Sequence, residues 1–252
     1  MIVHRIILSS SYSTGRRICL HFVDCDEGRF SHLLEKVKGA YGGKAVPLSI
    51  HMIVTSSKDW RSVTRKDPYF SDVVEIGDVD EFVSLLQKDR YLKGVDVARY
   101  ILSKMPCTHT RLEKLTYMCY ADYYCEYGQR LFRDKIYAFR LGPVIESVYE
   151  EYSTHSHRYP GEKIRFDDDL DDDIMHDEKY RMPIKSRILF SEDGQRKLRS
   201  IDRSLERYRK YSTDELVQMT HRERTPWSVT KKGPYQTISD DDIGRYHHFE
   251  TV

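Results

Sequence analysis

The sequence of 252 residues lacks several features that mark common classes of protein. No stretch approaches the ~20 apolar residues that a membrane-spanning helix requires, and the run Ile6-Ile7-Leu8 is too short for the apolar region of a signal peptide. An excess of one charge is also missing, since 41 Lys and Arg face 40 Asp and Glu and leave a net charge of +1. These absences argue against a membrane protein, a globally basic nucleic-acid-binding protein and a highly charged disordered chain.

Cysteine is scarce, and its spacing favours neither a disulfide framework nor a zinc site. The five cysteines are an odd number, and none of them forms a C-x-x-C pair. Cys19 and Cys25 are six positions apart, as are Cys119 and Cys125. We interpret all five as reduced thiols of a cytoplasmic protein, with a disulfide or zinc arrangement as the less favoured alternative. We expect no metal and no cofactor.

Residues 1–90 alternate between strand and helix signals, which predicts a small α/β unit. Short apolar runs typical of strands occur at Arg5 to Leu8, Ile18 to Val23, Ile50 to Val54 and Val73 to Ile76. Helical patterns begin at Ser31 and at Val79. Gly42-Gly43-Lys44 lacks the upstream glycine and the Ser or Thr of a phosphate-binding loop, so a simple turn is favoured there.

Helical periods dominate from residue 91 to residue 235. Thr108 or Thr110 can cap a helix that ends at Gly128, and Gly142-Pro143 is expected to start another with proline in its first turn. Ser191 is expected to begin the longest helix, and Ser212 with Glu215 has the spacing of a capping box. The predicted fold class is therefore α+β, with a small N-terminal α/β unit followed by a mainly α-helical domain.

Two polar segments complete the expected organisation. The stretch from Thr154 to Pro183 is acidic and poor in apolar residues, so a long and partly mobile insertion is expected. Residues 236–252, which carry Asp240-Asp241-Asp242 and His247-His248, are expected to form a flexible tail.

Two runs of like charge invite functional hypotheses but have simpler explanations. The acidic run from Asp167 to Asp173, followed by Glu178, has the ligand spacing of a calcium loop, yet Asp172 stands where the sharp turn needs glycine. A solvated loop is favoured. The basic stripe from Arg196 to Lys210 could follow phosphates, but Asp202 and Glu206 interrupt it. The charged face of an amphipathic helix explains it more simply, and nucleic-acid binding is not expected.

The sequence offers no constellation that commits it to catalysis. There is no G-x-S-x-G nucleophile motif, and His155 with His157 has no carboxylate or cysteine at ligand spacing. Glu113, Glu126, Glu146 and Glu150 fall on predicted helices whose exposed faces would carry glutamates in any case. We therefore predict a protein without enzymatic activity, although residues 1–90 leave that question open.

Thr220-His221 and Thr225-Pro226-Trp227 form a local unit just after a helix that ends near Met219. Pro226 restricts the backbone between the polar ring of His221 and the apolar ring of Trp227. One interpretation is a packing plug, in which Trp227 closes the end of the helical core and His221 binds a backbone carbonyl. The other is a binding patch, and the two interpretations are compatible.

The segment from about Gly94 to Tyr235 resembles the Panacea domain, a family that includes SocA-type antitoxins and phage-associated proteins. Val95 to Leu102 is similar to its opening helix, and Leu112, Lys114, Leu115 and Tyr117 match its L-x-K-L-x-Y helix. Ala138, Gly142, Pro143 and Val144 match its A-x-x-x-G-P-V turn. Leu205 to Tyr208, with Thr220, His221, Pro226 and Trp227, resembles its closing signature. The expected Panacea-like domain therefore comprises residues 91–235. The resemblance does not extend to residues 1–90.

The resemblance implies a bacterial or phage antitoxin that binds and neutralises a cognate toxin protein. The family also implies a second partner, a ClpX-type protease to which the toxin is delivered. Neither activity requires this chain to form or break a covalent bond. The α/β extension ahead of the domain departs from the family pattern and could confer the choice of partner.

Tyrosine richness favours the same function, because the chain has 19 tyrosines and five of them crowd one predicted helix. Not all of these rings can enter the core, and half-exposed tyrosines make good interface anchors. We predict that the partner-binding residues are Tyr117, Tyr120, Tyr124, Tyr127, His221 and Trp227.

Two alternative functions remain. The first is an enzyme or regulator that acts on nucleotides or nucleic acid through residues 1–90, with the basic segment Lys58 to Lys66 in its favour. The second is a transcriptional autoregulator that uses the basic helix.

Overall fold

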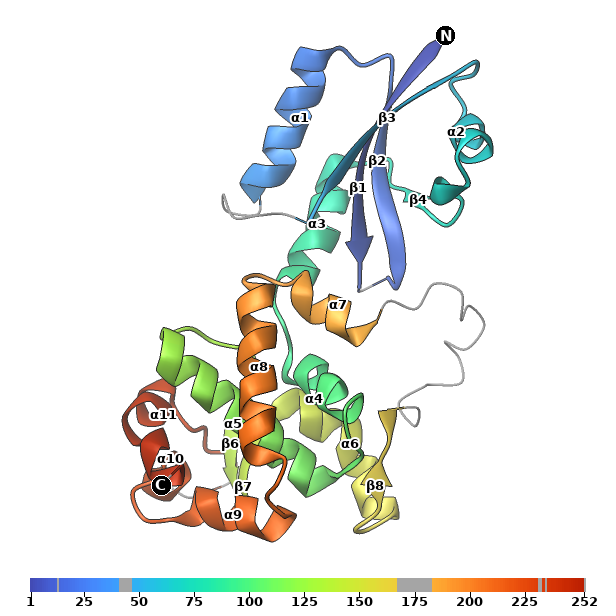
Figure 1. Ribbon diagram of the computed structural model, residues 1–252. Helices are drawn as coiled ribbons and strands as arrows, with labels where there is room; N and C mark the ends of the chain where they lie inside the picture. Colours follow the sequence, from blue (N-terminus) through green and yellow to red (C-terminus); the bar gives the residue numbers. More distant parts are fainter. Residues whose placement is uncertain (13, 41–46, 167–182, 231–232, 234, 252) are drawn as a thin grey trace. The chain divides into compact units, whose positions relative to one another are not determined.

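The computed structural model describes residues 1–12, 14–40, 47–166, 183–230, 233 and 235–251 (Figure 1). The expected acidic run from Asp167 to Asp173 lies outside these residues. The described chain divides into two compact units. The N-terminal unit contains Met1–Tyr91 and Phe190–Glu192, and the C-terminal unit contains 92–166, Ile184–Leu189 and 193–251. The predicted α+β class is confirmed, because a four-stranded mixed sheet with helices precedes a largely helical region.

The sheet of the N-terminal unit has helices on both faces (Figure 1). Its strands are β1 (Ile2–Ser11), β2 (Arg16–Val23), β3 (Ser49–Thr55) and β4 (Val74–Glu75), in the order β3-β1-β2-β4. β1 pairs antiparallel with β2 and with β3, whereas β4 runs parallel to β2. The helices are α1 (Glu27–Ala40), α2 (Trp60–Lys66), η1 (Pro68–Phe70) and α3 (Val79–Arg90).

Alternation along β1 explains the two layers of this unit. Ile7 packs with residues of α1 and α3, such as Phe30 and Phe82. Its neighbours Ile6 and Leu8 pack on the other face with Val63 of α2. Successive side chains of a strand point to opposite faces, so one strand serves two small cores.

The C-terminal unit is arranged around α5 (His109–Tyr127), most of whose residues are buried. Its other elements are α4 (Gly94–Leu102), β5 (Cys107–Thr108), β6 (Ile136–Phe139), β7 (Gly142–Ile145), α6 (Glu146–Arg158), β8 (Lys163–Ile164), α7 (Ile184–Leu189), α8 (Gly194–Tyr208), α9 (Thr213–His221), α10 (Pro226–Val229), α11 (Asp240–Tyr246) and η4 (His247–Glu250). As predicted, the Thr108 side chain caps α5, Gly128 ends it with a φ of 61°, and Ser212 forms a capping box with Glu215.

Three predictions about this unit were wrong. Gly142-Pro143 lies in strand β7 rather than at a helix start, and α6 begins only at Glu146. The helix predicted from Ser191 begins at Gly194 and is shorter than α5. The tail predicted to be flexible forms α11 and η4, with Ile243 and Glu250 buried, because its apolar and charged side chains find partners on α5.

Within the described residues, no helix combines the length and the apolar character that crossing a membrane would demand. All five cysteines are free thiols.

Candidate functional site

Two charged residues of α5 close one edge of the β6–β7 hairpin. The Lys114 ammonium donates a hydrogen bond to the carbonyl oxygen of Pro143 at 2.7 Å. The amide of Ile145 donates to the Glu113 carboxylate at 2.8 Å. Both side chains are buried, and they satisfy strand groups that would otherwise be unpaired in the core. Pro143 is suited to this edge because it has no amide that requires a partner.

Burial sets the protonation of this pair. It lowers the pKa of Lys114 to about 8, against the opposing effect of the Glu113 and Glu250 carboxylates. It raises the pKa of Glu113, against the opposing hydrogen bonds from His109 and Ile145. Glu113 is therefore a buried residue that binds the backbone of β7, and it does not lie on the exposed helix face where the sequence places it.

Glycine is required at position 142 because the backbone there passes close to two side chains. Gly142 has a φ of 100°, and a Cβ atom added to it would lie 2.7 Å from Thr220 Oγ1 and 2.9 Å from Lys114 Cε. Four residues of the predicted family motif, Lys114, Gly142, Pro143 and Thr220, thus meet at one point.

His221 and Trp227 hold the turn between β6 and β7 from the other side. The Trp227 indole donates to the carbonyl oxygen of Phe139 at 2.7 Å. The His221 ring lies 3.1 Å from the carbonyl oxygen of Arg140 through Nε2 and 2.7 Å from that of Val217 through Nδ1. The two ring centroids are 3.8 Å apart. These contacts are those of the packing plug.

A cluster of half-buried and exposed aromatic and apolar side chains lies around the same turn. Ring contacts connect Tyr137 with Phe139 and Tyr235, and Phe139 with Tyr149. Tyr235 is 72% exposed and Leu141 is 49% exposed. We call this surface the hairpin aromatic face; it consists of Tyr137, Phe139, Leu141, Tyr149, Trp227 and Tyr235.

An open groove of about 470 Å³ lies in this face, and Ala138, Phe139, Arg140, Trp227 and Gly233 line it. An exposed aromatic surface beside a groove is the composition that protein interfaces favour. Trp227 therefore combines the two interpretations of its motif, since one part of the residue holds the turn and another lines the groove.

The predicted tyrosine surface on α5 was wrong for the rings at its centre. Tyr117, Tyr120 and Tyr123 are fully buried, because helices and the C-terminal tail surround α5. The Tyr120 hydroxyl donates to Asp240 of that tail at 2.6 Å. Buried rings cannot touch a partner protein, so Tyr117 and Tyr120 are core residues.

The outer rings of α5 are half-buried and already have partners. Tyr127 contacts the guanidinium of Arg196 and accepts a hydrogen bond from Arg203. Tyr124 lies parallel to the ring of Tyr120. The hairpin aromatic face is therefore the better candidate interface. Its signal in the sequence is the G-P-V turn followed by Trp227.

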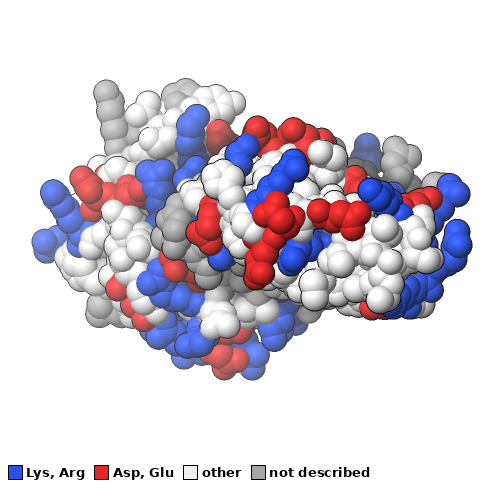
Figure 2. Space-filling model, turned by 90° about the horizontal axis from the view of Figure 1, so that it is seen from above, with Lys and Arg blue, Asp and Glu red and all other residues white. Residues whose placement is uncertain are grey.

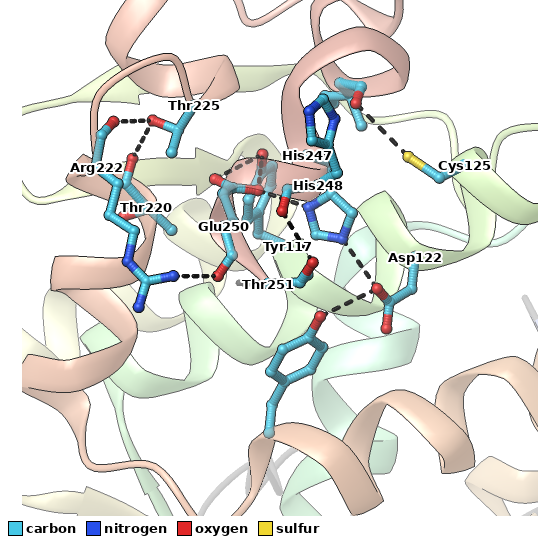
Figure 3. A network of polar contacts seen from close by, with 12 residues as sticks. Tyr117, Asp122, Cys125, Thr220, Arg222, Thr225, His247, His248, Glu250 and Thr251 are labelled. Atoms are coloured by element: carbon cyan, nitrogen blue, oxygen red, sulfur yellow. Dashed lines mark hydrogen bonds and ion pairs between the residues drawn. The ribbon is translucent and has the colours of Figure 1, made fainter.

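A buried ionisable network connects the C-terminal tail to α5 (Figure 3). The His247 ring contacts Glu250 at 2.6 Å and Asp122 at 2.9 Å, and the Tyr117 hydroxyl donates to Glu250. Burial opposes a charge on His247, but the two carboxylates outweigh it and raise the pKa of His247 to about 9. The His247 and Glu250 side chains are at most 5% exposed, so the network holds the fold and has no access to a substrate.

Several basic side chains of helix α8 form ion pairs with acidic neighbours. Arg196 pairs with Asp193, Arg203 with Glu126 and Arg207 with Asp122. On the face seen in Figure 2, basic and acidic side chains are interspersed. This pairing does not favour the autoregulator hypothesis. Among the residues that the structure describes, no group of three or more His, Cys, Asp or Glu side chains could hold a metal ion.

A substitution at Trp227 tests the packing role of its ring. Trp227→Ala is expected to lower the free energy of unfolding by about 3 kcal/mol, because a large aromatic side chain is removed from the edge of the core. Trp227→Phe keeps most of the packing but loses the bond to Phe139, which should cost about 1 kcal/mol. Urea denaturation measures both, and an unchanged midpoint for Trp227→Ala would show that the ring is not a plug.

Comparison with known proteins confirms the resemblance for part of the chain. Residues 112–228 match the family model described as "Antitoxin SocA-like, Panacea domain". No curated protein matches the chain, and no solved structure matches it. Lys114, Gly142, Thr220 and Trp227 lie within the matched range, whereas His247 and Glu250 lie outside it.

Proposed function

We propose that this chain is an antitoxin that neutralises a cognate toxin protein by binding it directly through the hairpin aromatic face. The match of residues 112–228 to the SocA-like antitoxin family is the observation that carries the proposal. The cytoplasm is the proposed setting, which suits the five free thiols.

Three properties of the hairpin aromatic face support this assignment. Its rings already contact one another, and Trp227 is bonded to the hairpin carbonyl of Phe139, which reduces the conformational entropy lost when a partner binds. Tyr235 and Leu141 are exposed apolar groups that a partner would bury. Arg140 lies on the groove and gives it one polar, charged contact.

Growth rescue tests the proposal. The chain is co-expressed with the product of the neighbouring gene, and growth is expected to be restored if that product is the toxin. Tyr235→Ala and Leu141→Ala should each weaken binding by about tenfold or more and reduce the rescue, because they remove apolar anchors. The affinity is measured by calorimetry with the purified toxin.

Tyr159→Ala is the matched control, since Tyr159 is also a half-exposed tyrosine of the C-terminal unit, at 47%, and has no ring contact with the hairpin aromatic face. Rescue should be unchanged in this variant. Equal affinity of Tyr235→Ala, Leu141→Ala and wild type would reject this surface, and absence of any complex with a toxic neighbour would reject direct neutralisation.

Delivery of the toxin to a ClpX-type protease is a separable part of the proposal. It predicts that the toxin disappears faster in cells that contain both the chain and the protease. A constant toxin level, with growth still rescued, would leave sequestration as the whole mechanism.

A further inference from the structure

Four side chains, one from each strand of the N-terminal sheet, form a continuous row of hydrogen bonds. In the strand order β3-β1-β2-β4 they are Thr55, His4, His21 and Glu75. Thr55 Oγ1 lies 2.8 Å from His4 Nε2, His4 Nδ1 lies 2.7 Å from His21 Nε2, and His21 Nδ1 lies 2.7 Å from the Glu75 carboxylate.

The row is buried at its centre and open at one end. His4 is fully buried and the His21 side chain is 4% exposed, whereas that of Glu75 is 42% exposed. The Trp60 ring of α2 packs against His21 at 5.0 Å. At its other end Thr55 enters the turn before α2, where His4 Nε2 also lies 2.9 Å from the carbonyl oxygen of Ser57.

With both rings neutral, Glu75 fixes the direction of every hydrogen bond. A carboxylate only accepts, so His21 carries its proton on Nδ1 and accepts through Nε2. His4 must then donate through Nδ1 and accept through Nε2. The donor available to His4 Nε2 is the Thr55 hydroxyl.

Adding one proton to His4 changes the hydrogen bonds at the Thr55 end of the row, because Nε2 becomes a donor. When His4 is doubly protonated, Nε2 donates, and the Ser57 carbonyl at 2.9 Å is its acceptor. The Thr55 hydroxyl is then free to donate to the Ser57 carbonyl at 2.7 Å or to engage Ser62 Oγ at 2.8 Å. In the neutral state the Ser57 carbonyl keeps the Ser62 hydroxyl as a donor at 3.0 Å, so the two protonation states use different bonds in the turn from Thr55 to Ser62.

We propose that this row is a pH-dependent switch, in which one proton on His4 selects between two hydrogen-bond arrangements of the turn that begins α2. The charged groups around it are Glu75, Asp24 and Lys58, the last paired with Asp24 at 3.4 Å, while Trp60 faces it with an apolar ring. Burial lowers the pKa of His4, with His21 acting in the same direction and Asp24 and the Ser57 carbonyl opposing. The neutral arrangement is therefore the one present near neutral pH, and acidification produces the other.

Imidazole NMR of the full-length chain between about pH 5 and pH 8 tests the switch. The signals of His4 should change in one step, and the amide signals of Ser57 and Ser62 should change in common with it. His51, which contacts Ser49 and lies outside the row, is an internal reference. A step in the His4 signals that leaves the amide signals of Ser57 and Ser62 unchanged would overturn the proposal.

Two substitutions at Thr55 make the test sharper. Thr55→Val keeps the shape of the side chain but removes the donor to neutral His4, so the midpoint of the common step should rise by about one pH unit. Thr55→Ser keeps the hydroxyl and should leave the midpoint unchanged. Equal midpoints in the two variants would overturn the proposal.

Glu75→Gln offers an independent measurement at the other end of the row. The amide oxygen still accepts from His21, but the negative charge that favours protonation is removed, so the midpoint should fall. An unchanged midpoint would show that Glu75 does not act on the pair. The amide signals of α1 and α3, which pack in the same unit but outside the row, report whether each variant is folded.

Discussion

Replacing His247 with alanine should lower the free energy of unfolding by about 3–5 kcal/mol, because the substitution leaves the buried Glu250 carboxylate and the partly buried Asp122 carboxylate without their shared cation. His247 lies between Asp122 of α5 and Glu250 of η4. His248→Ala is the matched control, since His248 is the neighbouring residue and its ring is exposed. Denaturant unfolding measures both variants, and equal losses would show that the network does not hold the tail.

The same network predicts a decline of stability as the pH rises. The pKa of His247 is about 9 in the folded chain and 6.5 as the ordinary value. A raised histidine pKa contributes stability that is fully present below about pH 6.5 and is lost as the pH rises through about 9. Burial lowers the pKa of Lys114 from 10.5 to about 8, so Lys114 makes stability rise with pH, but only above about pH 8.

Melting temperatures between about pH 6.5 and pH 8 therefore isolate His247 from Lys114. The wild-type chain should lose stability over this interval, and His247→Ala should show a smaller decline. A parallel decline in the two chains would assign the pH dependence to other groups.

The second large effect is expected at Gly142. Gly142→Ala should cost about 3 kcal/mol or more, because the new Cβ would lie within 3 Å of Thr220 and Lys114 in addition to adopting an unfavourable φ. Gly128→Ala is a matched control, since Gly128 also has a positive φ but has open space where its Cβ would lie. It should cost about 1 kcal/mol. Equal losses at the two glycines would show that the close approach at position 142 is unimportant.

Local signals in the sequence were sufficient for the elements of secondary structure that depend on nearby residues. The cap at Thr108, the glycine that ends α5 and the capping box of Ser212 with Glu215 all lie where the sequence predicts them. The segment at Gly142-Pro143 has the local pattern of a helix start because proline suits both the first turn of a helix and a strand position whose amide has no ladder partner. Which one forms depends on the pairing of β6 with β7.

Residues that act through distant partners could not be assigned in this way. Glu113 and Lys114 belong to a helix whose sequence allows them to be exposed, and only the approach of β7 turns both into buried partners of its backbone. Tyr117 and Tyr120 were expected at the surface for the same reason, since nothing local indicates that α11 and η4 cover them. The tail itself carries a signal, because Ser239 precedes Asp242 at cap spacing and Ile243 follows.

The sequence by itself determined the α+β class, the main helix and strand patterns, and the family resemblance at residues 112–228, because each depends on residue order and short-range periodicity. The tertiary structure alone decided which motif residues meet at Gly142, which rings are exposed and which charges are buried together. These properties are set by contacts between residues that are far apart in the chain. Periodicity gives the face on which a residue lies, but only packing determines what covers that face.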